Sequence, residues 1–185
     1  MLAAVLLGLA GVSALAQGLA DEDRDWGVAP QSELRPAPYA APTPLAVPGA
    51  HTVRTDDLAR SLSEGGGPLL IDVASGEGHV TLAGAVWWPG MGRGANFVDA
   101  VQGELARRLE QATGGDKTRP LVFFCVNSQC WLSYNASLRA VALGYRQVLW
   151  YRGGVAAWRE AGLPLGKVGA PWSPALPVAP APPGA

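Results

Sequence analysis

The sequence predicts an α/β domain in which a mainly parallel, five-stranded sheet is flanked by helices on both faces. Between residues 50 and 166, short apolar runs alternate with amphipathic stretches, and the runs lack the apolar–polar alternation of half-exposed strands. Continuous apolar strands are buried on both faces, and strands separated by helices form parallel sheets. A chain of 185 residues fits one such domain with extensions.

The predicted strands cover residues 51–53, 69–73, 85–88, 121–124 and 147–151. The predicted helices cover residues 56–63, 96–111, 131–143 and 154–161. We expect Thr55 to N-cap the first helix, because Asp56 and Asp57 then fall in its first turn, where the helix dipole favours acidic groups. In the second helix, Val98 and the apolar residues that follow it to Leu109 fall at helical spacing.

The first sixteen residues are apolar and end in an A-x-A sequence at Ala16. This pattern predicts a secretory signal peptide that is cleaved after Ala16. A membrane anchor is the alternative, but the run is shorter than the ~20 apolar residues of a spanning helix. With cleavage, the mature protein has no stable membrane span and is exported to the periplasm, where disulfides persist.

Two further segments lie outside the predicted domain. Residues 17–49 are acidic and then rich in proline, so an extended, non-helical conformation is expected. Residues 167–185 are rich in proline and alanine and predict a disordered tail. The net charge of −1 indicates neither a nucleic-acid site nor an anionic-membrane surface. The acidic cluster at 21–25 could dock a basic partner such as a cytochrome c, or it is simply solvated.

The only two cysteines, Cys125 and Cys130, delimit a six-residue segment between an apolar strand and a helical pattern. Converging loop N–H groups and a helix N-terminus favour a thiolate, which is the nucleophilic form of cysteine. We expect the Cys125 sulfur to project into a ring of amide hydrogens, with the Cys130 sulfur close enough to act as a second thiol. A structural disulfide is the alternative, and the pair could also rest as a disulfide in an oxidising compartment.

The other candidate site residues belong to the loop, the start of the following helix and two nearby segments: Val126, Asn127, Ser128, Gln129, Trp131, Asp72 and Arg93. Asp72 could orient the loop or an arginine, or cap its own strand. Arg93 could fold over the site as a cation, or be a solvated loop residue. Trp131 is expected to form a pocket wall or a partner contact.

Metal or haem ligation is a weaker alternative for this site. It would need His51 or His79, and neither histidine is near the cysteines in sequence. We therefore predict no cofactor and no metal site.

Several blocks in order resemble a rhodanese domain: LIDV at 70–73, His79, GAV at 84–86, VFFC at 122–125, YRGGVAAW at 151–158 and AGLP at 161–164. The resemblance covers nearly all of residues 50–166, and it implies that Cys125 is the nucleophile that carries a persulfide. Phosphatase relatives of the fold have a longer loop and an arginine that grips phosphate. Cys130 stands where many rhodaneses carry arginine, so phosphatase chemistry is not expected and ordinary thiosulfate sulfurtransfer is weakened.

A narrower resemblance involves PYAAPTP at 38–44, PGA at 48–50 and CWLSYNA at 130–136. These blocks are similar to the exported PQQ-dependent catabolism-associated CXXCW motif proteins. Here Asn127 stands at the first cysteine of that motif, and the pair is Cys125-x4-Cys130 instead.

The two resemblances imply an exported rhodanese-like protein that handles persulfide sulfur or thiol–disulfide chemistry, with a small sulfur donor or acceptor. The narrower one implies an association with periplasmic alcohol oxidation, in which a quinoprotein alcohol dehydrogenase or a cytochrome c would be the partner. The alternative is a non-catalytic accessory or maturation module that binds such a dehydrogenase or cytochrome.

Overall fold

The computed structural model describes residues 17–65, 67–76 and 80–167. Five parallel strands form its main sheet, which confirms the predicted α/β fold class. In spatial order the strands are β1 (His51–Val53), β6 (Val148–Tyr151), β5 (Leu121–Phe124), β2 (Leu69–Asp72) and β4 (Val86–Trp87). The signal peptide predicted for residues 1–16 lies outside the described residues, as does the tail predicted beyond Lys167.

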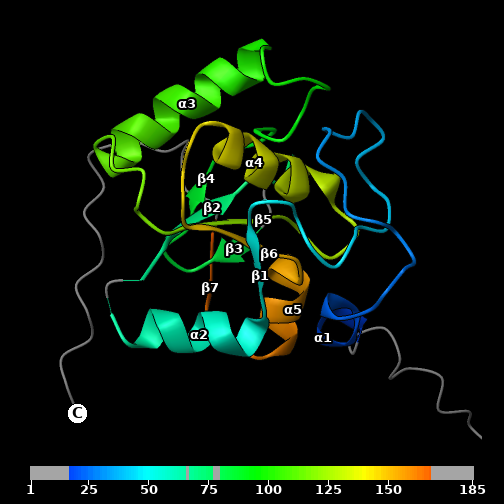
Figure 1. The fold of residues 1–185 in the computed structure, drawn as a ribbon. Helices are drawn as coiled ribbons and strands as arrows, with labels where there is room; N and C mark the ends of the chain where they lie inside the picture. Colours follow the sequence, from blue (N-terminus) through cyan, green and yellow to red (C-terminus); the bar gives the residue numbers. More distant parts are fainter. Residues whose placement is uncertain (1–16, 66, 77–79, 168–185) are drawn as a thin grey trace, which may run out of the picture.

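Helices cover both faces of this sheet (Figure 1). One face carries α3 (Ala100–Thr113) and α4 (Trp131–Ala142), and the other carries α1 (Gln17–Glu22), α2 (Thr55–Ser63) and α5 (Gly154–Glu160). Successive residues of a strand point to opposite faces. Accordingly, Phe123 lies in the buried cluster that includes Leu105 of α3, whereas Phe124 lies in the cluster that includes Trp158 of α5.

The first and second predicted helices begin elsewhere than expected. Thr55 is the first residue of α2 rather than its N-cap, because its hydroxyl is bound to Glu22 and Tyr151 and the extended Arg54 precedes the helix. Helix α3 begins at Ala100, four residues later than predicted, and Asp99 caps it by accepting a hydrogen bond from the Gln102 N–H at 2.9 Å. Val98 lies before this cap and is 91% exposed.

Three short elements are absent from the prediction. β3 (Val80–Leu82) and β7 (Leu165–Lys167) form a two-stranded antiparallel sheet, so Lys167 belongs to a strand and not to a tail. Three-residue strands carry little periodic signal, and these two are distant in sequence. The extended conformation expected for residues 17–49 is wrong at Gln17–Glu22, which form α1 and pack against α5.

The rest of the N-terminal segment, residues 23–49, contains no helix and lies along α4. Leu34 and Val47 are buried in a cluster with Trp131, Tyr134 and Trp150. This segment therefore forms part of the hydrophobic core of the protein. Among the described residues, no helix is long and apolar enough to cross a membrane.

Candidate functional site

Cys125 and Cys130 form a disulfide across the loop that joins β5 to α4. Their Cα atoms are 6.2 Å apart. The expectation that the second sulfur lies within reach of the first is therefore met. The loop leaves the carboxyl end of a central strand, which is where sites form in parallel sheets.

Both cysteines are buried in the hydrophobic core, whereas the Cys125 sulfur was expected to project into a ring of amide hydrogens. Cys125 is 2% exposed and Cys130 is 7% exposed. They belong to the hydrophobic cluster that also includes Ala74, Trp88 and Leu132. The disulfide is therefore shielded from reagents in solution in this conformation.

The four residues between the cysteines differ in their exposure. Val126, Asn127 and Gln129 are exposed, whereas Ser128 is buried. The Asn127 side chain accepts a hydrogen bond from the Gln129 N–H at 3.0 Å, which turns the loop on itself. The tip of the loop thus faces solvent while its two ends are fixed.

Helix α5 holds the first half of the loop. The Val155 N–H donates to the Cys125 carbonyl at 3.0 Å, and the Ala156 N–H donates to the Val126 carbonyl at 2.9 Å. Gly154, at φ +61°, makes this close approach possible, because a Cβ there would lie 2.4 Å from the Cys125 carbonyl oxygen. The glycine pair at the start of α5, Gly153 and Gly154, is therefore part of the loop's support.

The N-terminal segment holds the second half of the loop through residues 39–43, which we call the cover. Ala40 forms an antiparallel bridge with Cys130. The Ala41 N–H donates to the Gln129 carbonyl at 3.0 Å, and the Thr43 hydroxyl donates to the Ser128 carbonyl at 2.6 Å. The loop therefore lies between a helix from the C-terminal half of the chain and a segment from its beginning.

Arg152, which sequence reasoning missed, ties this N-terminal segment to the sheet. Its Nε–H donates to the Thr43 hydroxyl at 3.1 Å, and its four terminal N–H groups reach the carbonyls of Asp21, Glu22, Arg24 and Thr43 at 2.7–3.1 Å. All five guanidinium donors are thus used. Burial lowers the pKa of Arg152, and the nearby acidic residues 21–25 oppose that effect. The sequence did offer one indication of this role, because Arg152 stands between a buried strand and a pair of glycines.

Asp72 lies at the buried end of β2. Its side chain accepts a hydrogen bond from the Ala74 N–H at 2.8 Å, in agreement with the strand-capping alternative. Arg93 is exposed and donates to the Ser75 hydroxyl at 3.2 Å, so its guanidinium is bound just beyond the end of the same strand. These two residues therefore lie at the carboxyl edge of the sheet.

Trp131 is fully buried and forms a wall between α4 and the N-terminal segment. Its indole N–H donates to the Pro42 carbonyl at 3.0 Å, and the Arg35 guanidinium lies 4.9 Å from the ring centre. In this structure Trp131 therefore contacts the protein's own N-terminal segment, at Pro42 within the cover.

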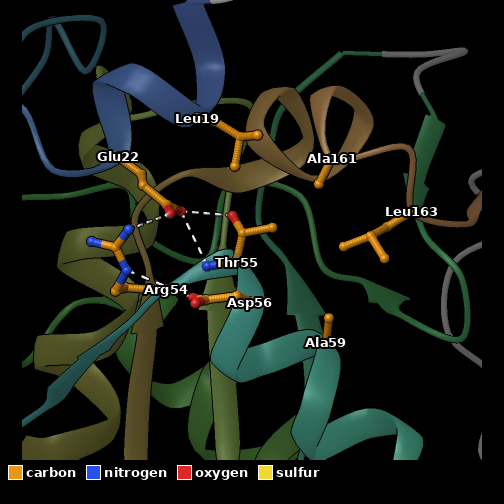
Figure 2. Close-up of a pocket in the computed structure, with 8 residues that line it drawn as sticks. All are labelled: Leu19, Glu22, Arg54, Thr55, Asp56, Ala59, Ala161 and Leu163. Atoms are coloured by element: carbon orange, nitrogen blue, oxygen red, sulfur yellow. Dashed lines mark hydrogen bonds and ion pairs between the residues drawn. The ribbon is translucent and has the colours of Figure 1, made fainter.

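A hollow with a volume of about 610 Å³ lies between α1, α2 and α5 (Figure 2). Its walls are apolar at Leu19 and Leu163. Its polar groups bond to one another: the Glu22 carboxylate accepts from the Thr55 hydroxyl at 2.6 Å, and that hydroxyl pairs with the Tyr151 hydroxyl at 2.7 Å. Burial raises the pKa of Tyr151. The hollow contains no cysteine.

Potential metal ligands do not cluster in the part of the chain that the structure describes. His51 lies exposed on β1, whereas His79 falls outside the described residues.

The model of the rhodanese-like domain matches residues 55–161, which is more than half of the chain. The chain belongs to the rhodanese-like domain family. The matched span contains both cysteines, four strands of the main sheet and the helix that supports the loop. It begins after the cover, so in this rhodanese-like protein residues 17–54 lie outside the matched domain.

Three of the solved structures that match part of this chain come from different organisms. The Alr3790 protein from Anabaena sp. is 21% identical and has a TM-score of 0.44; the match covers 60% of this chain and 77% of that one. A Rhodopseudomonas palustris protein of unknown function, described as a possible tyrosine phosphatase, is 20% identical, with coverage of 63% and 85% and a TM-score of 0.45. A yeast protein tyrosine phosphatase of the rhodanese family is also 20% identical, with coverage of 62% and 87% and a TM-score of 0.45. Among curated protein sequences, no significant match was found.

Proposed function

We propose that this rhodanese-like protein is an exported thiol–disulfide exchange protein that cycles between the Cys125–Cys130 disulfide and the corresponding dithiol. One observation carries the proposal: the disulfide joins the two ends of the loop that bears the nucleophilic cysteine in this family. The second cysteine supplies what a single-cysteine rhodanese lacks, an internal thiol that can resolve an intermediate on Cys125.

The exchange needs a dithiol partner as the source of two electrons. One partner thiolate attacks one sulfur of the disulfide, forms a mixed disulfide and releases the other cysteine as a thiolate. The second partner thiolate then attacks the mixed disulfide and leaves as an oxidised partner, and the released cysteines take up two protons. In the reverse direction the dithiol reduces a disulfide of the partner.

Persulfide chemistry can use the same two residues. A persulfide on Cys125, attacked by the Cys130 thiol at its inner sulfur, gives the Cys125–Cys130 disulfide and releases hydrogen sulfide. The dithiol is then regenerated by a reductant. By contrast, phosphatase chemistry is not supported, because segment 125–130 contains no arginine and Cys125 has no free thiolate while it is oxidised.

Export is supported by the A-x-A signal ending at Ala16 and by the disulfide itself, since structural and redox disulfides persist in oxidising compartments. The resemblance to the CXXCW motif proteins supports an association with PQQ-dependent alcohol oxidation. The partner proposed on that basis is a periplasmic quinoprotein alcohol dehydrogenase or a cytochrome c.

A second candidate is the accessory module that binds such a dehydrogenase or cytochrome without catalysis. The burial of both cysteines favours it, because a disulfide that is shielded from solvent stabilises the fold without meeting a partner thiol in this conformation. Exchange and accessory binding differ in whether the thiols are needed.

The test uses the full mature chain and the variants Cys125→Ala, Cys130→Ala and Cys125→Ala/Cys130→Ala. Exchange with a disulfide substrate and sulfur transfer to cyanide are measured from the reduced protein. We expect exchange in the wild type, a trapped mixed disulfide in Cys130→Ala, and background rates in both variants that lack Cys125. Equal background rates in all four proteins, with normal growth of the double variant on alcohol, would favour the accessory module instead.

A further inference from the structure

We propose that residues 39–43 are a removable cover over the redox disulfide, and that the hydrogen bonds of Thr43 to Arg152 and Ser128 set how often this cover opens. The role of the cover in exchange with a partner rests on the proposed thiol–disulfide function. The opening of the cover does not depend on that function, because a small reductant can measure it directly.

The cover contacts the disulfide-bearing loop along its length. Besides the bridge from Ala40 to Cys130, the Trp131 N–H donates to the Tyr39 carbonyl at 2.9 Å. The Tyr39 ring packs against the hydrophobic cluster that contains both cysteines, and its hydroxyl accepts from the Gly94 N–H at 3.0 Å. The cover thus lies between the glycine-rich stretch 90–94 and the second half of the loop.

Thr43 is the residue on which the contacts of the cover converge. Its hydroxyl donates to the Ser128 carbonyl at 2.6 Å and accepts from the Arg152 Nε–H at 3.1 Å. Its carbonyl accepts from an Arg152 terminal nitrogen at 3.1 Å. All three residues are at most 2% exposed, so these bonds form away from water, where they are strong.

Exchange requires that this arrangement open. A thiolate must reach a sulfur atom directly, and residues that are 2% and 7% exposed do not offer that approach. Local opening of a segment is the usual route to such groups. The cover is a segment of five residues held by hydrogen bonds rather than by a strand or helix of its own, so it can be released without unfolding the sheet.

The test measures the rate at which dithiothreitol reduces the disulfide of the native, full mature chain, followed by alkylation and mass spectrometry. Thr43→Val keeps the shape of the side chain but removes its hydroxyl, and Thr43→Ser keeps the hydroxyl. Thr52→Val is the matched control, because the hydroxyl of the exposed Thr52 bonds to the Leu45 carbonyl, outside the cover. We expect reduction to be about tenfold faster in Thr43→Val, since the hydroxyl loses one hydrogen bond to the charged Arg152 and one to the Ser128 carbonyl. Thr43→Ser and Thr52→Val should match the wild type.

Hydrogen exchange separates release of the cover from general destabilisation. In Thr43→Val the Ala41 and Thr43 amides should exchange faster, while amides of β5 and β6 keep their protection. An unchanged reduction rate in Thr43→Val would overturn the proposal. So would acceleration of the β5 and β6 amides in proportion to the reduction rate.

Failure of the proposed function gives a different pattern. If the disulfide is purely structural, Thr43→Val still accelerates reduction by dithiothreitol, although no disulfide substrate is exchanged. If the cover is wrong but the function is right, exchange with a disulfide substrate proceeds at equal rates in Thr43→Val and Thr52→Val.

Discussion

Arg152 is a buried cation whose five N–H donors all bind residues of the N-terminal segment. Its partners are 109 to 131 positions away in the sequence, so no local pattern could reveal them. The cysteine pair, in contrast, was predictable because strand, loop and helix follow one another directly. Site residues could thus be predicted from the sequence where their neighbours are local, but not where their partners are brought together only by the tertiary fold.

We predict that Arg152→Met lowers the free energy of unfolding of the oxidised protein by about 3 kcal/mol, because several carbonyls lose a charged partner in the interior. Arg152→Lys should cost less, since an ammonium keeps the charge and up to three donors. Denaturant unfolding of both variants checks this. A loss below about 1 kcal/mol in Arg152→Met would show that water replaces the guanidinium.

Gly154 and Gly162 form a matched pair of glycines, because both have positive φ but only Gly154 is crowded. A Cβ at Gly154 would lie 2.4 Å from the Cys125 carbonyl oxygen, whereas nothing lies within 4 Å of one at Gly162. Gly162→Ala should cost about 1 kcal/mol for the left-handed backbone alone. Gly154→Ala should cost at least about 2 kcal/mol more, since the loop must shift. Equal losses in chemical unfolding would contradict the close support of the loop by α5.

At the scale of elements, α3 and α4 are joined by a buried arginine. Arg139 of α4 donates to Gln102 at 2.9 Å and to Asp99, the N-cap of α3, at 2.7 Å. Burial alone would raise the pKa of Asp99, but the hydrogen bonds that its carboxylate accepts from Arg139 and from the Gln102 N–H leave it lowered. Helical spacing identified α3, yet its start was misplaced because Asn96, whose side chain accepts from the Val98 N–H, forms a turn that imitates a cap.

On the exposed side of α3, hydrogen bonds from Arg107 and Arg108 lower the pKa of Glu104 to about 2 from the ordinary 4.5. Because the pKa is depressed in the folded state, the pair stabilises the protein above pH 4.5, and this contribution is lost as the pH falls from 4.5 toward 2. Glu104→Gln should therefore flatten the dependence of unfolding free energy on pH in this window. The difference should stay below about 1 kcal/mol, because the pair is exposed.

Equilibrium unfolding at several pH values, at low and high salt, measures this effect. Salt should shrink the difference between wild type and Glu104→Gln. Identical pH profiles of the two proteins would contradict this, because they would mean that the pKa of Glu104 is the same in the folded and unfolded states.

At the scale of the whole molecule, the N-terminal segment completes the fold. Composition correctly excluded a helix where prolines recur, but it could not indicate packing, since the partners of Leu34 and Val47 lie on α4 and β6. The central strands were predictable because their apolar runs are continuous. The pairing of β3 with β7 was not, because it joins two three-residue segments from distant parts of the chain.

A chain that begins at Ala50 tests the role of this segment. Its loss should expose the cluster that contains Trp131 and Trp150 and shift tryptophan fluorescence to the red. The unfolding midpoint should fall by more than about 10 °C, which corresponds to a loss of several kcal/mol in the free energy of unfolding. Deletion of residues 168–185, predicted to be a disordered tail, is the control and should change neither observable. Equal fluorescence spectra in the two truncated chains would mean that residues 17–49 are dispensable for the core.

The most direct test of the account is a redox titration of the mature protein in dithiothreitol buffers, with the thiol state read by mass spectrometry and the fold by circular dichroism. We predict a reversible two-electron transition between folded disulfide and folded dithiol, with a midpoint between about −120 and −270 mV, the range of exchange proteins. A midpoint below about −300 mV, typical of structural disulfides, or reduction only together with unfolding, would contradict it.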